Sequence, residues 1–412
     1  MTALFTCKFL ASPSQPDAIA LGLLERLDLS EFYAQVRSYV DGPGRPASDP
    51  QVLLGLWVYG TAQGISSGRQ LAPLSETDDR YRWLRGGVPV DYHMLDDFRV
   101  AKQEALDQLM TEILALLMDQ GLVRLEGVAH DGVRLRANAG AASFRRRRRL
   151  EEHLEQAQQQ VKQLAQEREE GAEQGRARQR AAQERAASDR ERRLEEALRE
   201  IPLVEAVKAR QRKKQGRARR ERVGEARVSE TDAQARVMKM ADGGFRPAMN
   251  AQLATDMESQ VMVGVAVTNR GTDECLAAPM EEQVAQRTGR HPGKYVVDGG
   301  FASLADIVTL SQRQVTLYSP SRPPTGDKRR QDPTLPRLGD PPEVAAWRRR
   351  MATPEAQATY RQRGATAECV NAQVEGRYGL RQLPVRGLDK ALSVLLLVAI
   401  THNLLRWIAL TA

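Results

Sequence analysis

VAHDGVRLRAN (128–138) is a short β-prone segment that carries one acidic residue, Asp131. Apolar residues alternate through this part of the chain, from Val123 to Leu135, with the period of two that is typical of a strand. A second segment, KYVVDGGFAS (294–303), places Asp298 directly after a short apolar run. The alternative is a turn or helix-cap role for Asp131 and turn chemistry for Asp298. Because α/β proteins bind ligands at strand ends, we predict that both Asp residues belong to a site on a sheet.

A third acidic residue, Glu368, lies in YRQRGATAECVNAQ (360–373), a helix-like run that leads into an apolar C-terminus. Carboxylate oxygens are the ligands that Mg²⁺ prefers, and this ion keeps positions open for water and phosphate. Two such ions, about 4 Å apart, activate a nucleophile and stabilise a leaving oxygen at phosphorus. We therefore predict two Mg²⁺ ions, with Mn²⁺ as a substitute, held by catalytic Asp131, Asp298 and Glu368.

The composition favours a polyanionic partner in a reducing compartment. The 412 residues include 61 Lys and Arg against 53 Asp and Glu, a net charge of +8, which together with phosphorus chemistry predicts double-stranded DNA. The three cysteines are isolated, so we predict a cytoplasmic protein without disulfides. The N-terminus lacks a signal-peptide pattern, and the apolar run ALSVLLLVAI (391–400) is too short to cross a bilayer. We read that run as a core helix and predict no membrane association.

The hydrophobic period changes along the chain and predicts three domains. Residues 1–120 read as a helical DNA-binding domain, and residues 121–143 with 226–412 read as an α/β catalytic domain. Between them, residues 144–225 read as an inserted helical hairpin. Its apolar residues follow coiled-coil spacing, and Pro202 is expected to end its second helix. The seam consists of Leu150, Leu154, Ala157, Val161 and Leu164.

The ends of the predicted hairpin are strongly basic. RRRRR occupies 145–149, and KARQRKKQGRARRER occupies 208–222 and includes Lys213 and Lys214. Such runs are either solvated arms or contacts to the DNA backbone, whose affinity would fall steeply with salt. The sequence leaves both readings open.

As a set and in this order, the segments resemble the DDE transposases of bacterial insertion sequences. HDGVRLRANA (130–139) is similar to the family's first catalytic strand, and VVDGGFAS (296–303) is similar to its second Asp motif. The segment from 360 to 390 resembles the Tyr-Arg-Glu-Lys signature, with Tyr360, Arg363 and Glu368 in the matching places. Glu375 stands where the signature has Lys, which leaves Arg377 or Arg381 to take over the phosphate contact.

The resemblance implies a fold and a function. The fold is an RNase H-like mixed sheet flanked by helices, with the first Asp on the central strand, the second on a nearby parallel strand and the Glu on an adjacent helix. The function is binding of the element's terminal repeats, metal-dependent strand cleavage and strand transfer, by a homodimer in the DNA complex because two ends must be joined. The alternatives are a nuclease without strand transfer and a domesticated, inactive DNA-binding derivative. The predicted DNA contacts, besides Lys213 and Lys214, are Tyr360, Arg363, Arg377, Arg134 and Arg136.

Overall fold

The computed structural model describes residues 22–34, 48–169, 177–214, 224–321 and 332–412. The chain forms two compact units. The first consists of Met1–Leu135, Asn250–Arg381 and Asp389–Ala412, and the second of Arg136–Met249 with Gln382–Leu388. The predicted domain borders at residues 120, 143 and 225 stay predictions. Cys7 and the predicted hairpin tip lie outside the described residues.

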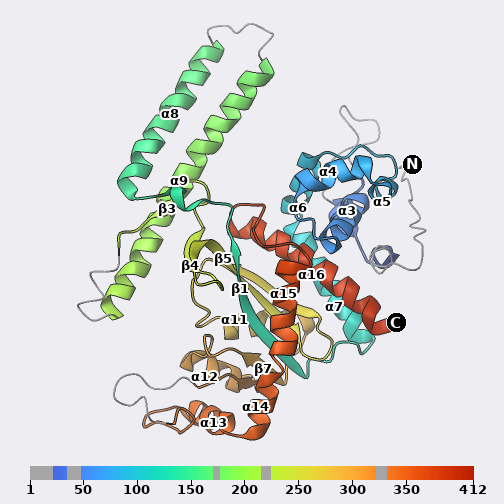
Figure 1. Ribbon diagram of the computed structural model, residues 1–412, viewed down its shortest axis with the longest axis vertical. Helices are drawn as coiled ribbons and strands as arrows, with labels where there is room; N and C mark the ends of the chain where they lie inside the picture. The colour runs from blue at the N-terminus through green and yellow to red at the C-terminus, as the bar shows by residue number, and fades with distance from the viewer. Residues whose placement is uncertain (1–21, 35–47, 170–176, 215–223, 322–331) are drawn as a thin grey trace. The chain divides into compact units, whose positions relative to one another are not determined.

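The central feature of the fold is a mixed sheet with the strand order β4-β5-β1-β7-β8, to which β6 adds by pairing with β5. β1 runs parallel to β7, and β7 runs parallel to β8, whereas β5 is antiparallel to both β4 and β6. This mixed sheet, with the Asp131 strand in its interior and helices around it, confirms the predicted RNase H-like fold (Figure 1). The strands are β1 (Gly127–Arg136), β4 (Arg236–Lys239), β5 (Phe245–Asp256), β6 (Met262–Thr268), β7 (Lys294–Val297) and β8 (Thr316–Tyr318).

Helices pack against this sheet where small residues allow close approach. Gly264 on β6 is one such place, because a Cβ there would lie 2.6 Å from the sulfur of Met280 on α11 (Ala277–Thr288). α12 (Leu304–Gln312) follows β7, and Ser303 caps it by accepting from the Asp306 amide. A further helix, α13 (Pro342–Met351), leads toward the segment that carries Glu368.

The C-terminal helix α16 (Leu388–Thr411) contains the apolar run that we read as a core helix. Its length and composition would also suit a membrane span, but 72% of its most apolar window is buried inside the protein. Asn403 binds both polar groups of the Met262 backbone, with Oδ1 2.8 Å from the amide and Nδ2 2.9 Å from the carbonyl. α16 therefore fastens the sheet at β6, which confirms its place in the core.

The N-terminal region is helical, as predicted. Asp49 caps α3 by accepting from the Gln51 amide, and Pro50 occupies the first turn, where its missing N–H leaves no bond unmade. Trp57 is buried, donates to the Leu95 carbonyl at 2.9 Å and stacks under the Arg99 guanidinium. The described helices are α2 (Ser30–Ala34), α3 (Pro50–Ala62), α4 (Gly68–Thr77), α5 (Asp79–Leu84), α6 (Tyr92–Ala101) and α7 (Gln103–Asp119).

The second unit contains the predicted helical hairpin, formed by α8 (Arg147–Glu169) and α9 (Ala177–Lys214), which lie side by side in Figure 1. Leu150 and Ala157 of the predicted seam are buried against Leu194 and Ile201 of α9. The expected helix end at Pro202 is wrong, because α9 continues through this residue to Lys214. A proline inside a helix costs about 3 kcal/mol, and we attribute its tolerance here to the burial of Ile201 and Val204 on either side.

Candidate active site

The register of two parallel strands brings the two Asp residues together. β1 pairs with β7 from Gly127 opposite Lys294 to His130 opposite Val297. Asp131 follows His130 and Asp298 follows Val297, so the two Asp residues occupy equivalent positions where the pairing of the two strands ends. Neighbouring strands lie about 5 Å apart, and residues at the same register position share a face of the sheet. The two carboxylates are therefore adjacent. Asp131 lies inside β1 rather than at its last residue, because β1 extends past its partner.

Asp131 is held from three sides. Its Oδ1 accepts from the Gly132 amide at 3.0 Å. Its Oδ2 accepts from Asn371 Nδ2 at 3.2 Å and lies 3.0 Å from Arg363 Nη1. Burial raises the pKa of the Asp131 carboxyl, attraction to Arg363 opposes this rise, and repulsion from Asp298 adds to it. A buried acid that is repelled by a second acid is an environment in which an added cation is stabilising.

Asp298 lies in a tight turn between β7 and α12. Its side chain accepts from the Gly300 amide, and its carbonyl accepts from the Ser319 hydroxyl at 2.9 Å. His130, beside Asp131 on β1, points to the opposite face because side chains alternate along a strand. It is fully buried and bonds to Gln252 at 2.7 Å, and burial lowers its pKa to about 4. His130 is therefore neutral near pH 7 and supports the sheet from behind.

Glu368 is placed by a π-helix, Gly364–Glu368, between α14 (Pro354–Arg361) and α15 (Cys369–Gly376). Ala367 packs in a buried cluster with Ala129 of β1 and Val296 of β7, the strands that carry the two Asp residues. Gln260, in a left-handed conformation with φ of 59°, donates from Nε2 to the Ala365 carbonyl at 2.9 Å. Single π turns inside helices are frequent at functional sites, because they change the facing of the residues that follow.

Arg363 joins two of the three acids. Its Nη1 lies 3.0 Å from Asp131 without hydrogen-bond alignment, and its Nη2 donates to Glu368. Burial opposes the charged form of Arg363, but attraction to Asp131, Glu368 and Asp298 outweighs this effect and raises its pKa. One guanidinium thus supplies the positive charge that the three carboxylates need.

Two family models match the chain. One is described as a transposase DDE domain and matches residues 218–404, and the other is described as a transposase domain and matches residues 13–101. The chain therefore contains a transposase DDE domain and a second transposase domain, which is consistent with a DDE transposase of insertion-sequence type. Comparisons with curated proteins and with solved structures find no match. The DDE match includes Asp298 and Glu368 but not Asp131, which the hairpin separates from the rest of the domain in sequence. Asp131 is therefore grouped with the matched residues by its register position opposite Asp298 and not by the family match.

The carboxylate oxygens of Asp131, Asp298 and Glu368 fit Mg²⁺ chemically, since they are hard, anionic donors. Among the described residues, however, no three Asp, Glu, His or Cys side chains converge closely enough to coordinate one ion. Glu368 is 55% exposed and engages Arg363, whose guanidinium lies between it and Asp131. The three carboxylates therefore suit a metal ion by their chemistry. In this structure, however, Arg363 occupies the place between Asp131 and Glu368 where a shared ion would bind.

The residues predicted to contact DNA lie in different parts of the structure. Tyr360 packs against the Ala129 cluster, and Arg363 lies over its ring. Arg134 pairs with Asp273 at 3.2 Å, and Arg377 is exposed beside Tyr378. Arg136 and Lys213, both exposed, belong to the second unit, and the Lys214 side chain lies outside the described residues. The structure thus brings Tyr360 and Arg363 to the acids and gives Arg134 a structural partner.

Two polar residues near Asp131 escaped the sequence reasoning: Asn371, which contacts the carboxylate, and Asp273, which lies on the side of the sheet where His130 bonds to Gln252. Asn371 bonds to Asp131, and its place three residues after Glu368, on the same helix face, was the available signal. Asp273 accepts from Asn250 at 2.7 Å and from Gln252 at 2.9 Å. A Cβ at Gly132 would lie 2.6 Å from Asp273, so this glycine makes room for the network. Asp273 sits in a loop without any motif, and nothing in the sequence marks it.

Proposed function

We propose that this transposase cleaves DNA strands at the ends of a mobile element and joins the freed ends to target DNA. Asp131, Asp298 and Glu368 are the catalytic acids. The observation that carries this proposal is the common register position of Asp131 and Asp298, with Glu368 linked to Asp131 through Arg363. Three acids from two strands and a helix, in a chain of net charge +8, suit chemistry on a polyanion.

When bound, two Mg²⁺ ions would supply an activated nucleophile and charge stabilisation at the leaving oxygen. Asp131, Asp298 and Glu368 would hold them. The chain's own residues bind and orient the strand. Arg363 is the nearest cation, and a phosphate that attracts its guanidinium would release Asp131 and Glu368 for coordination. Hydrolysis and strand transfer are both displacements at phosphorus, so one set of acids serves both.

We further propose that the transposase acts in the bacterial cytoplasm as a homodimer on DNA, since two element ends must be joined. Glu375, in the place where the signature has Lys, is exposed on α15 and repels phosphate. Arg377 and Arg381 are exposed shortly after it. We assign the missing phosphate contact to Arg377.

The test uses the purified protein and duplexes made from the DNA that flanks its gene. With Mg²⁺ we expect cuts at one position near each end, and joined products when target DNA is added. EDTA should abolish both. Cleavage without joined products would support the nuclease alternative. Specific binding without cleavage, in Mg²⁺ or Mn²⁺, would support the inactive derivative and contradict the proposal.

A further inference from the structure

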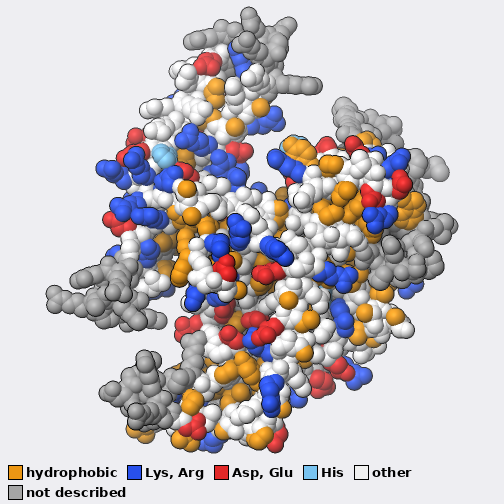
Figure 2. Space-filling view, in the orientation of Figure 1, with side chains coloured by type: hydrophobic (Ala, Val, Ile, Leu, Met, Phe, Trp, Pro, Cys, Tyr) orange, Lys and Arg blue, Asp and Glu red, His pale blue; other side chains and the backbone are white. Residues whose placement is uncertain are grey.

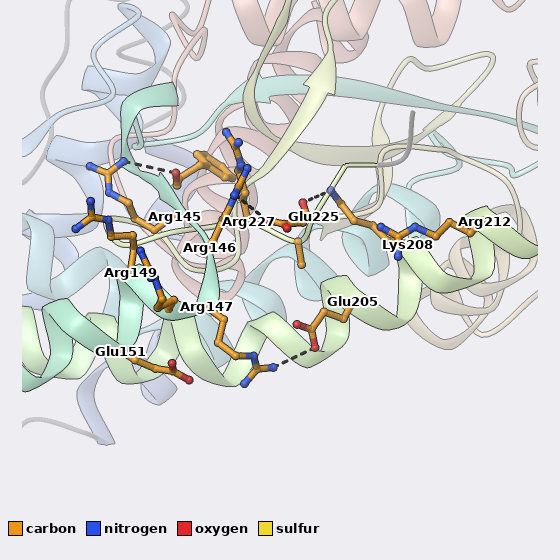
Figure 3. A pocket seen from close by; sticks show the side chains of 13 residues that line it. Arg145, Arg146, Arg147, Arg149, Glu151, Glu205, Lys208, Arg212, Glu225 and Arg227 are labelled. Atoms are coloured by element: carbon orange, nitrogen blue, oxygen red, sulfur yellow. Dashed lines mark hydrogen bonds and ion pairs between the residues drawn. The ribbon is translucent and has the colours of Figure 1, made fainter. Parts of the chain in front are cut away.

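The base of the hairpin, within the second unit, forms a concave and strongly basic surface. A cavity of about 920 Å³ lies between residues 144–149, the C-terminal part of α9 and residues 225–227 (Figure 3). Eight Arg or Lys side chains line it, against three Glu side chains. Figure 2 shows Lys and Arg side chains gathered around the N-terminal end of α8. Both halves of the basic sequence noted at the hairpin ends thus contribute to one cavity.

The placement of these charges opposes local stability. α8 begins at Arg147 and has no acidic residue in its first turn. The N-terminus of a helix carries partial positive charge, which favours anions and disfavours Arg. Arg147, Arg148 and Arg149 nevertheless occupy this turn, and their side chains are 45%, 83% and 62% exposed. A bound anion would be stabilised both by these side chains and by the helix end.

Carboxylates neutralise part of the charge. Glu230 pairs with Arg145, and Glu152 pairs with both Arg148 and Arg149. Arg146 pairs with Glu225 at 2.7 Å and Arg147 pairs with Glu205 at 3.0 Å. Exposed pairs of this kind contribute little stability, so a phosphate can replace the carboxylate. Lys208 donates instead to the carbonyls of Gly224 and Glu225, at 2.8 Å and 2.5 Å. Burial lowers the pKa of Lys208, and repulsion from Arg212 and Arg227 lowers it further.

We propose that this cavity binds the phosphate backbone of double-stranded DNA without regard to base sequence. The identity of the polyanion rests on the proposed function. Guanidinium groups bind phosphate through two parallel hydrogen bonds, and such contacts carry no sequence information. Among the described residues, the lining holds no Asn, Gln, Ser or Thr side chain, and its uncharged members, Phe144 and Ala226, are apolar. The basic residues that line this cavity are therefore a DNA contact rather than part of solvated arms.

The test measures binding of the whole chain to an unrelated duplex in EDTA, as a function of salt. In the variant Lys208→Gln/Arg212→Gln/Arg227→Gln, the slope of log affinity against log salt should shrink by about 0.9 for each phosphate that the protein no longer neutralises. A triple variant of α9, Arg185→Gln/Arg190→Gln/Arg192→Gln, removes the same charge from residues that do not line the cavity. At about 1.5 Å per residue, Arg192 lies about 24 Å along the helix from Lys208. This control should change the slope by less than half as much.

A second variant separates binding from folding. Arg148→Gln/Arg149→Gln removes cations from the positive end of α8, so its unfolding temperature should stay equal or rise while its salt slope shrinks. An unchanged slope in this folded variant, or an equally reduced slope in the α9 control, would overturn the proposal. Binding is measured in EDTA, where no strand is cut, and the catalytic proposal is tested by strand cleavage in Mg²⁺. Either result can therefore overturn the binding proposal without affecting the catalytic one.

Discussion

Asp298→Asn is expected to reduce the rate of cleavage of end DNA by about 10³-fold or more. Removing a single preorganised electrostatic interaction from an active site already costs about 10²- to 10³-fold, and a lost metal ligand should cost at least as much. Asp131→Asn and Glu368→Gln should do the same. Each change keeps the size of the side chain and removes one anionic oxygen ligand. Binding of end DNA in EDTA should stay the same or tighten, since negative charge is removed near the phosphates. A nicking assay in Mg²⁺, paired with a binding assay in EDTA, measures both effects.

Two neighbouring acids serve as matched controls for these variants. Glu375→Gln changes an exposed Glu on α15, the helix that follows Glu368 directly, and should retain or improve cleavage. Asp273→Asn removes a carboxylate near Asp131 that is already occupied by Asn250, Gln252 and Arg134. It should reduce cleavage far less than Asp298→Asn. If Asp273→Asn abolished cleavage and Asp298→Asn did not, the assignment of the catalytic acids would be wrong.

Arg363→Gln is expected to make the protein depend on divalent metal for stability. Arg363 and Asp131 are 13% and 18% exposed, and removing one partner of such a buried pair costs about 3 kcal/mol. In EDTA, the unfolding temperature should therefore fall. Mg²⁺ should raise it more than in the unchanged protein, because the carboxylates no longer have a resident cation. Cleavage should also fall, since the guanidinium that we expect to move to phosphate is gone.

The matched control is Arg361→Gln, which removes the same charge from an exposed position two residues earlier. Thermal unfolding with and without Mg²⁺, together with calorimetric titration of Mn²⁺, distinguishes the two variants. Arg363→Gln should bind Mn²⁺ at least about tenfold more tightly than the unchanged protein in the absence of DNA, a gain equivalent to about 1.4 kcal/mol. Equal metal affinity in both variants would show that Arg363 does not compete with the metal.

The sequence predicted the sheet and the two strands that carry Asp131 and Asp298, for a physical reason. Short apolar runs before Asp131 and Asp298 are buried strands, and burial constrains their composition strongly. The sequence did not predict the shared register of the two Asp residues, because strand pairing is a long-range contact with no local signal. The same holds for Asp273, which approaches Asp131 only through the packing of Gly132, Asn250 and Gln252.

Local rules failed where tertiary packing outweighed them. Pro202 is a strong helix breaker by itself, yet α9 passes through it while its neighbours are buried against α8. The sequence also did not predict the π-helix that ends at Glu368, because its residues, GATAE, suit an ordinary α-helix except for Gly364. That turn, with Ala367 buried against β1 and β7, sets the position of Glu368.

The most direct measurement of the central claim, that these acids hold the metal, is the metal preference of Asp298→Cys. A thiolate binds Mg²⁺ poorly and accepts softer ions more readily. The variant should therefore bind end DNA, fail to cut it in Mg²⁺, and regain a measurable part of its cleavage in Mn²⁺. Full cleavage by the variant in Mg²⁺ would contradict the account. Complete inactivity in both metals, in a folded protein that still binds DNA, would contradict it as well.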